Sequence, residues 1–442
     1  MKKVVPALKS LKEKAKARHN RDSCTSSSST DTTPQPAAPQ ANQQLEKTET
    51  VPKADPSKQE MSLLGQLPPP PTMLGRYRQL APRAAIHVSP LCLGAMSLGD
   101  RWGFMGFSEV NKEASFELLD AFFNAGGNFI DTANSYQDGA SEEFIGAWME
   151  ARGNRDQVVI ATKYTNSPHR ADKVNHANFC GNNIKSMRSS LEGSLKRLKT
   201  TYIDIFYVHY WDNHTSAEEI MDGLHSLVER GLVLYLGISD APAWFVVKCN
   251  EYAKAKGKTP FVLYQGPYSV LQRDLEREII PMCHHEGLAI APWNVLSAGR
   301  IRSDEEERKR RETGEKGRPG LMSPGWERTE AERKVCLVLE EIAPKVGTKH
   351  ITAVAIAYVL HKVPYMFPII GGRKVEHLLA NIEALSIRLN DEQLAAIEAS
   401  LPFDKGFPAN QMGEYGQYPF LLTMLTHFDP QPLLRPVLPS GN

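Results

Sequence analysis

Four ionisable side chains stand at the ends of three consecutive apolar runs, and together they could carry out acid and base chemistry. Asp131 and Tyr136 follow the first run, Lys163 ends the second and His209 ends the third. A lysine ammonium beside a tyrosine stabilises the phenolate, so we expect Lys163 to lower the pKa of Tyr136 from its usual value of about 10. Asp131 would pair with Lys163 and keep it charged, which would make Tyr136 a usable proton donor near neutral pH.

A neutral His209 could donate a hydrogen bond to the oxygen of a carbonyl substrate and orient it. The set includes no nucleophile and no metal, so a hydride would have to come from a nicotinamide cofactor. Taken singly, each side chain has a purely structural explanation: Asp131 could cap a turn, and His209 could be a hydrogen-bonded core imidazole. Their convergence favours a site for the reversible reduction of a carbonyl to an alcohol.

Eight short apolar runs alternate with longer helical patterns, and the four side chains belong to the second, third and fourth of these runs. Near-continuous apolar strands are typical of a parallel sheet covered by helices. Eight such units predict a (β/α)8 TIM barrel of the α/β class, in which active sites form at the carboxyl ends of the strands. The expected strands are residues 91–96, 128–133, 158–164, 203–210, 232–240, 261–269, 288–294 and 366–372.

The ends of these elements give further local predictions. Gly126 should end the helix after the first strand, and Ser141 should cap the start of the helix after the second. Residues 75–80 and 84–90 could pair as a hairpin that closes the bottom of the barrel. The charged insertion at residues 301–326 could be merely solvated, or it could fold over a ligand.

The chain divides into three parts by composition. Residues 1–71 are poor in aromatic side chains and rich in Lys, Ser, Thr, Gln, Ala and Pro, which predicts a long disordered N-terminal tail. Its basic start could be a targeting sequence, but the absence of an apolar centre favours a solvated tail. Residues 72–405 would form the barrel, and residues 406–442 a C-terminal tail that packs near or over the active-site face.

The composition of the whole chain argues against several classes of partner. Its 442 residues carry 52 basic and 51 acidic side chains, and a net charge of +1 gives no reason to expect nucleic acid as a partner. No apolar run reaches the roughly 18 residues of a membrane span. The six cysteines form no C-x-x-C pair, which indicates neither a zinc site nor a disulfide framework and suits the cytoplasm. We expect small-molecule partners, and the oligomeric state stays open.

Several motifs are similar, in order and spacing, to those of the aldo-keto reductase family. They are DTANSY, ATKY, YVHYWD, LGISD, YQGPYSVL and APWNVLSAG, and the resemblance covers roughly Leu80 to Leu401. The catalytic tetrad of that family falls on Asp131, Tyr136, Lys163 and His209. Two further stretches, CLGAMSLGDRWGFMG and FPIIGGRKVEHLLANIEALSIRL, resemble the aryl-alcohol dehydrogenase and norsolorinic acid reductase branch known from fungi.

The resemblance implies a site for NADP(H) in the second half of the barrel. Ser239, Asp240 and Gln265 would hydrogen-bond the nicotinamide carboxamide, and Trp293 would stack on the nicotinamide ring. Each of these residues also has a structural explanation. The Ser-Asp pair could cap a helix, Gln265 could hydrogen-bond backbone groups of the barrel, and Trp293 could fill the core.

The resemblance also places the phosphates of the cofactor at the start of the helix after the eighth strand, where backbone N–H groups and positive charge favour anions. The residues there are Gly371, Gly372, Arg373 and Lys374. Arg373 and Lys374 favour NADPH over NADH because a 2′-phosphate needs cationic partners. His377 and Asn381, one turn apart, would face the adenosine end. No G-x-G-x-x-G fingerprint follows an early strand, which argues against a Rossmann domain.

Aromatic side chains near the expected site indicate a planar, aromatic carbonyl substrate. Trp102 and Trp211 are the predicted substrate contacts, and Tyr415 or Tyr418 of the C-terminal tail could join them. Gln137 stands where much of the wider family has Gly directly after the catalytic Tyr, and it could alter the substrate rim.

Two other classes of function fit parts of the pattern. A Schiff-base enzyme would also use a strand-end lysine, but it would need neither Tyr136 nor His209 beside Lys163. A regulatory protein could keep the cofactor site and turn over little or nothing.

Overall fold

The computed structural model describes residues 67–103, 110–169, 172, 175–314 and 325–439. The predicted disordered tail therefore lies outside the described residues, except for its last five positions. These lead into a short 3-10 helix, η1 (Met73–Gly75), whose first turn is capped by the side chain of Thr72.

Eight parallel strands form one sheet in the order β10-β3-β4-β5-β6-β7-β8-β9. Hydrogen bonds close it between its first and last strands: the backbone N of Phe367 lies 2.8 Å from the oxygen of Ile290, and that of Ile369 lies 2.9 Å from the oxygen of Pro292. The predicted (β/α)8 barrel is confirmed. Its strands are β3 (Cys92–Gly94), β4 (Phe129–Asp131), β5 (Val159–Tyr164), β6 (Ile203–Val208), β7 (Val233–Ser239), β8 (Phe261–Gln265), β9 (Ala289–Ile290) and β10 (Ile369–Ile370).

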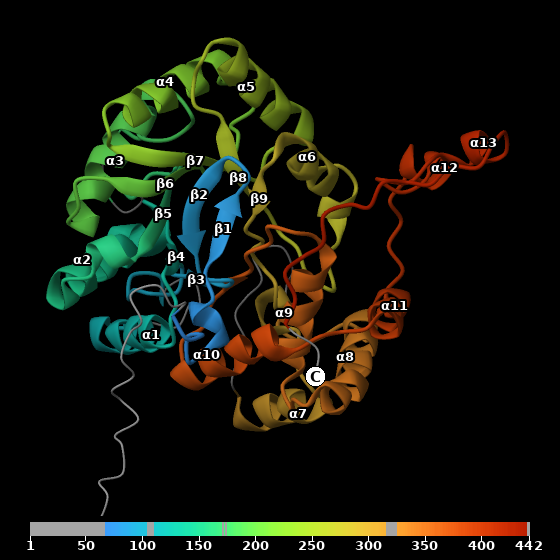
Figure 1. Ribbon diagram of the computed structural model, residues 1–442. Coiled ribbons are helices and arrows are strands. Elements are labelled where there is room, and N and C mark those ends of the chain that lie inside the picture. The colour runs from blue at the N-terminus through green and yellow to red at the C-terminus, as the bar shows by residue number, and fades with distance from the viewer. Residues whose placement is uncertain (1–66, 104–109, 170–171, 173–174, 315–324, 440–442) are drawn as a thin grey trace, which may run out of the picture. The chain divides into compact units, whose positions relative to one another are not determined.

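Helices lie around the outside of this sheet (Figure 1). In α4 the apolar side chains recur at helical spacing, so that Ile220, Leu224 and Leu227 are buried on one face. The helices are α1 (Lys112–Asn124), α2 (Ala140–Arg152), α3 (Ile184–Leu198), α4 (Ala217–Glu229), α5 (Ala243–Ala255), α6 (Ile279–Glu286), α7 (Asp304–Thr313), α8 (Glu330–Ile342), α9 (Ile351–Lys362), α10 (Val375–Ile382), α11 (Asp391–Ser400), α12 (Ala409–Met412) and α13 (Phe420–Thr423).

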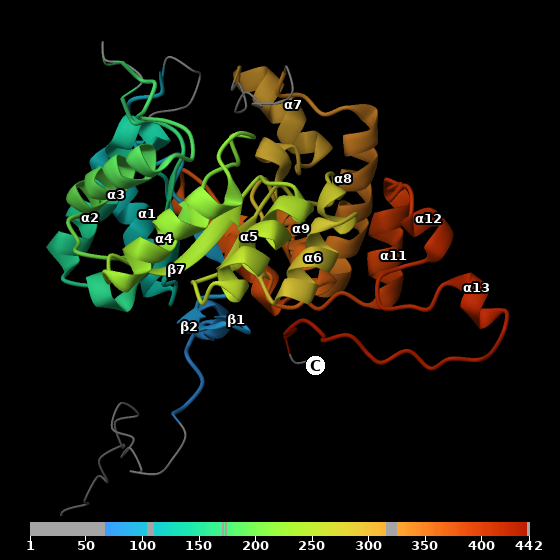
Figure 2. The same ribbon diagram turned by 90° about the horizontal axis from the view of Figure 1, so that it is seen from above.

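The predicted hairpin closes the amino end of the barrel. β1 (Arg78–Ala81) pairs antiparallel with β2 (Ala84–Val88), and Leu80 and Val88 join the cluster of apolar side chains that fills the inside of the strands. In Figure 2 this hairpin lies on the opposite side of the strands from α7. The carboxyl ends of the strands are thus left for the site.

Two predictions about helix ends have different outcomes. Gly126 follows the end of α1 with φ of +92°, a left-handed conformation that glycine adopts without strain, so the expected stop is confirmed. The prediction for Ser141 is wrong, because α2 begins at Ala140 and its N-cap is Gly139. The hydroxyl of Ser141 is buried instead and donates to the oxygen of Ala95 at 2.8 Å.

The charged insertion contains helix α7, and residues 315–324 of it lie outside the described residues. Two nearly buried arginines bind this helix to the segments that precede α7 and α8. Arg302 lies 3.0 Å from the carboxylate of Glu307, and Arg328 pairs with both Glu307 and Asp304 at 2.6 Å. The charged insertion is therefore more than a solvated run of charges. That it folds over a ligand stays a prediction.

The C-terminal tail contacts the barrel away from the carboxyl ends of the strands. The hydroxyl of Tyr415 lies 3.1 Å from Nδ1 of His284, in the last turn of α6. Leu434 lines a small apolar hollow with Pro82 of the hairpin turn and Tyr365, which precedes β10. Both contacts lie away from the carboxyl ends of the strands, where the tail was expected, and Leu434 itself stays 63% exposed.

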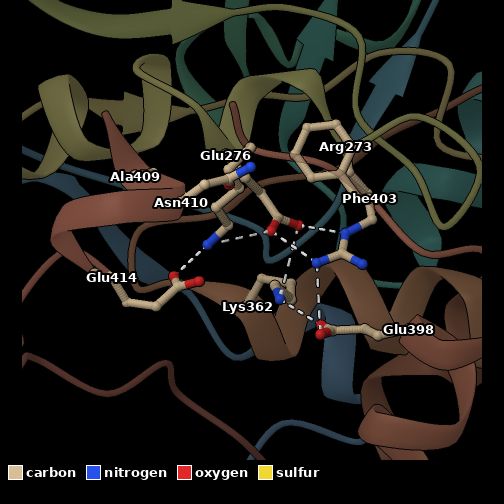
Figure 3. A pocket seen from close by; sticks show the side chains of 10 residues that line it. Arg273, Glu276, Lys362, Glu398, Phe403, Ala409, Asn410 and Glu414 are labelled. Atoms are coloured by element: carbon tan, nitrogen blue, oxygen red, sulfur yellow. Dashed lines mark hydrogen bonds and ion pairs between the residues drawn. The ribbon is translucent and has the colours of Figure 1, made fainter. Parts of the chain in front are cut away.

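Paired charges anchor the start of this tail. A hollow of about 610 Å³ is lined there by side chains of α9, α11, α12 and the 3-10 helix η5 (Asp274–Glu276), and Figure 3 shows Glu276 between Arg273 and Lys362. Glu276 accepts two hydrogen bonds from Arg273 at 2.8 Å and a third from the hydroxyl of Tyr268 at 2.7 Å. Burial alone would raise the pKa of Glu276, but these contacts and the Lys362 charge lower it.

We expect Glu276→Gln to destabilise the protein by about 2–4 kcal/mol, because the substitution removes the nearer carboxylate of buried Arg273 and leaves only its 3.5 Å ion pair with Glu398. The matched control is Glu414→Gln at the exposed edge of the same hollow, where an ion pair with Lys405 should contribute about 0–1 kcal/mol. Urea unfolding of the two variants measures both effects. Equal losses of unfolding free energy would contradict the buried role of Glu276.

Candidate active site

The four predicted chemical side chains meet at the carboxyl end of the barrel. Asp131 ends β4, Lys163 lies near the end of β5, and His209 directly follows β6. Tyr136 begins the 3-10 helix η3 (Tyr136–Gly139), which links β4 to α2. Parallel pairing brings these three strand ends side by side, which no single local motif could do.

The ammonium of Lys163 is the centre of the site. The side chain is completely buried, and its Nζ lies 2.5 Å from Oδ1 of Asp131. Nζ also donates to the backbone oxygen of Thr132 at 2.7 Å and to the hydroxyl of Tyr136 at 3.3 Å. Burial alone would lower the pKa of Lys163, but the charge and hydrogen bonds of Asp131 and Tyr136 outweigh it, and the pKa is raised. Lys163 is therefore a fixed positive charge.

The second oxygen of Asp131 has its own partner across the barrel. Nε2 of Gln265, in β8, donates to Oδ2 of Asp131 at 2.9 Å. Gln265 is also a predicted contact of the cofactor amide, which stays a prediction, and its side-chain N–H is directed to the acid that orients Lys163. No signal in the sequence links these two residues, because only closure of the barrel brings them together.

The pKa of Tyr136 is raised above its usual value, so the predicted lowering is wrong. Burial is the largest cause, and the carboxylate of Asp131 adds to it, while the Lys163 charge acts in the opposite direction. The sequence shows the neighbouring lysine but not the depth at which both groups lie. At neutral pH the phenol is therefore protonated, and it can act as an acid without first gaining a proton.

His209 is a neutral imidazole packed against Tyr136. The two ring centroids lie 5.7 Å apart at an interplanar angle of 79°. Burial and the positive charge of Lys163 lower the pKa of His209 to about 3. Among the described residues, its buried Nδ1 has no hydrogen-bond partner. A neutral ring carries one N–H, which suits donation to an uncharged oxygen.

The two predicted substrate contacts, Trp102 and Trp211, lie in different surroundings. Trp102 is 6% exposed, and its ring meets that of Tyr136 edge-on at a centroid distance of 6.4 Å. The ring of Trp211 stacks on that of Phe245 with the ring centroids 4.0 Å apart. Its Nε1 donates to the backbone oxygen of Thr215 at 2.9 Å. Trp102 thus lies at the tetrad, whereas Trp211 is engaged in packing beside α5.

Two predicted cofactor residues are joined through Asp240. The carboxylate of Asp240 accepts from the hydroxyl of Ser239 at 3.1 Å and from Nε1 of Trp293 at 3.2 Å. Burial raises the pKa of Asp240 to about 6, although the hydrogen bonds from Trp293 and Ser239 act in the opposite direction. The ends of β7 and of the segment after β9 therefore form one polar edge beside the tetrad.

The start of α10 has the chemistry of a phosphate site. Gly371 and Gly372 follow β10, Lys374 occupies the N-cap position, and no side chain caps the first turn. Arg373 and Lys374 are exposed there. Uncapped N–H groups with adjacent cations fit an anionic ligand.

The two predicted adenosine contacts on the same helix differ in exposure. His377 is exposed and Asn381 is 4% exposed. A contact at His377 would thus involve the outer surface of α10, and one at Asn381 would require an approach along its inner face.

Within the described part of the chain, no group of three or more His, Cys, Asp or Glu side chains could hold a metal ion. No helix among the same residues has the length and apolar character to cross a membrane.

Comparisons with known proteins agree with the (β/α)8 fold. The sequence model of the Aldo/keto reductase family matches residues 90–402. An aryl-alcohol dehydrogenase (NADP+) of Phanerodontia chrysosporium is 55% identical over 384 residues, which cover 86% of this chain and 100% of that protein. A putative aryl-alcohol dehydrogenase of Saccharomyces cerevisiae is 52% identical and covers 80% of this chain and 93% of its own length. Norsolorinic acid reductase A of Aspergillus parasiticus is 50% identical, and the match covers 80% of this chain and 88% of that protein.

Proposed function

Because this chain belongs to the aldo/keto reductase family, we propose that it is an NADP(H)-dependent oxidoreductase that reduces an aromatic aldehyde or ketone to the alcohol and can run in reverse. The observation that carries the proposal is the contact of buried Lys163 with both Asp131 and the Tyr136 hydroxyl. A bound reduced nicotinamide would supply the hydride.

Each member of the tetrad has one task in this proposal. Tyr136 gives its phenolic proton to the carbonyl oxygen as negative charge develops there. Lys163 stabilises the phenolate that remains, and Asp131 holds Lys163 in place. His209 donates a hydrogen bond to the same oxygen and so fixes the direction from which the carbonyl is reached.

The donor set at the other strand ends fits NADP(H). Arg373 and Lys374, beside the uncapped start of α10, would hold phosphate groups, and two cations there suit a 2′-phosphate. Trp293 and Ser239 would hold the nicotinamide over the tetrad, with Asp240 fixing both through its carboxylate. Gly371, Gly372, His377 and Asn381 would complete the cofactor site.

The side chain of Trp102 supports an aromatic substrate, because it covers Tyr136 from one side and offers an apolar ring edge. Relatives named aryl-alcohol dehydrogenase and norsolorinic acid reductase support the same class.

A Schiff-base mechanism is disfavoured by the state of Lys163. Its nitrogen donates to three acceptors and its pKa is raised, so it is a poor nucleophile. Borohydride together with substrate should leave Lys163 unmodified.

The second candidate function is a cofactor-binding protein with little turnover. A direct assay distinguishes it from the reductase. Oxidation of NADPH is followed by absorbance with a panel of aromatic and aliphatic aldehydes and ketones. Turnover with aryl carbonyls supports the reductase, and binding of NADPH without turnover across the panel supports the alternative.

The two reaction directions should differ in pH dependence at saturating cofactor. Because the folded-state pKa of Tyr136 is raised, its proton is present throughout the neutral range and kcat for reduction should vary by less than about threefold between about pH 6 and about pH 9. Oxidation needs the phenolate as base, so its kcat should rise by up to about tenfold per pH unit. His209, with a pKa of about 3, stays neutral and adds no change. If kcat for reduction and kcat for oxidation both fell as the pH was lowered through neutrality, these assignments would be contradicted.

A further inference from the structure

Gln137, the residue directly after Tyr136, is buried and strained. It is 1% exposed, although a glutamine here could have reached solvent from a strand-to-helix turn. Its φ of +54° lies in the left-handed region, which disfavours a residue with a Cβ. A long polar side chain kept in such a conformation needs a compensating set of contacts.

The amide of Gln137 makes those contacts with the loop that follows β3. Its Oε1 accepts from the backbone N of Trp102 at 2.9 Å and from that of Arg101 at 3.1 Å. Its Nε2 donates to the backbone oxygen of Met96 at 3.2 Å. One side chain therefore binds both ends of the segment from Met96 to Trp102.

The middle of this segment is fitted to the same side chain. A Cβ added at Gly99 would lie 2.5 Å from both Cβ and Cγ of Gln137, and Gly99 has a φ of +142°. The loop thus lies directly on the Gln137 stem, and its path requires glycine at this position.

A second, exposed attachment joins the same loop to α2. Arg101 pairs with Glu143, and its Nη1 donates to the backbone oxygen of Asp138 at 2.9 Å. Both side chains of this ion pair are about two-fifths exposed, so the pair contributes little to holding the loop. The buried amide of Gln137 is the stronger constraint.

We propose that Gln137 is a positioning residue for substrate selection, because it fixes the backbone of Trp102 and so holds the indole against the ring of Tyr136. The inference rests on the proposed reductase function. The Trp102 ring then forms a rigid apolar wall beside the proton donor, which favours a planar aromatic carbonyl over a flexible aliphatic one. Gln137 touches neither the tetrad hydrogen bonds nor the predicted cofactor residues in the contacts described above.

The test is the variant Gln137→Gly. Glycine accepts the left-handed backbone without strain, so the variant should fold, while all three hydrogen bonds to the loop are lost. We expect hydrogen exchange of the peptide spanning Met96–Trp102 to become faster. We also expect the ratio of kcat/KM for benzaldehyde to that for butanal to fall by roughly tenfold or more, mainly through KM for benzaldehyde. Affinity for NADPH should stay within about twofold.

Two further variants control this experiment. Gln137→Glu keeps the acceptor for the N–H groups of Arg101 and Trp102 but loses the donor to the Met96 oxygen, so its ratio should lie between those of wild type and Gln137→Gly, even if Gln137→Gly folds poorly. Glu143→Gln removes the exposed ion pair with Arg101 and should leave the ratio unchanged. If Gln137→Gly loosens the loop but retains the wild-type ratio, or if both aldehydes lose equally, the positioning role is overturned while the reductase function stands. If wild-type protein turns over neither aldehyde and no other carbonyl of the panel, the proposed function itself falls, and the hydrogen-exchange result still reports on the loop.

Discussion

Replacing Tyr136 by Phe is expected to lower kcat for carbonyl reduction by about 10²–10⁴-fold, the usual contribution of a positioned general acid. The substitution removes only the hydroxyl that lies 3.3 Å from Nζ of Lys163. Without it, the group to which we assign proton donation to the developing alkoxide is missing. His209 cannot replace Tyr136, because a pKa of about 3 leaves the imidazole neutral and a weak acid.

The ring of Tyr136 should stay in place in this variant. It packs edge-on against both Trp102 and His209, and these contacts do not use the hydroxyl. Unfolding free energy should fall by about 1.5–3 kcal/mol, since one hydrogen bond to a charged partner is lost. NADPH affinity should stay within about twofold, so the effect would appear in kcat rather than in cofactor binding.

Tyr210→Phe provides the matched control. It removes a tyrosine hydroxyl from the same face, one that donates to Oδ1 of Asn166 at 2.9 Å, and it lies next to His209 in the chain. Activity within about threefold of wild type is expected for this control. Single-turnover measurements with bound NADPH separate the chemical step from product release. A Tyr136→Phe protein with a near-normal rate in that experiment would show that another group donates the proton.

The sequence was sufficient to predict the strands and the position of the tetrad. Each of the eight strands falls within its expected run, because buried parallel strands have the same apolar character throughout and each is followed by a helix. Asp131, Lys163 and His209 could be placed together because equivalent ends of adjacent strands must meet. That prediction rests on the regular spacing of the apolar runs and on the parallel pairing of the strands.

Contacts between distant segments could not be predicted in the same way. The bond from Gln265 to Asp131 spans the barrel, and no local pattern encodes it. The pKa direction for Tyr136 was wrong because burial exceeds the effect of its charged neighbour, and burial depends on the packed structure. Gln137 was noticed as an unusual residue, but its three bonds to the β3 loop depend on a left-handed backbone that side-chain type alone did not indicate.

A second large effect is expected for Lys163→Met, which should reduce both activity and stability. Asp131 would remain buried with the N–H of Gln265 but without the ammonium that lies 2.5 Å away. Removing one partner of a buried ion pair costs about 3–5 kcal/mol of unfolding free energy. Reduction should slow by about 10²–10⁴-fold, because the phenolate of Tyr136 would form without a neighbouring positive charge.

The double variant Asp131→Asn with Lys163→Met separates these two effects. It replaces a buried charge pair by an uncharged amide and an apolar side chain of similar length, a change that is often nearly neutral for stability. We expect urea unfolding to recover to within about 1–2 kcal/mol of wild type, with single-turnover reduction as slow as in Lys163→Met. Recovery of both quantities would show that the charge of Lys163 serves only folding. Recovery of stability alone assigns that charge to the proton-transfer step, as the contact between its ammonium and the Tyr136 hydroxyl implies.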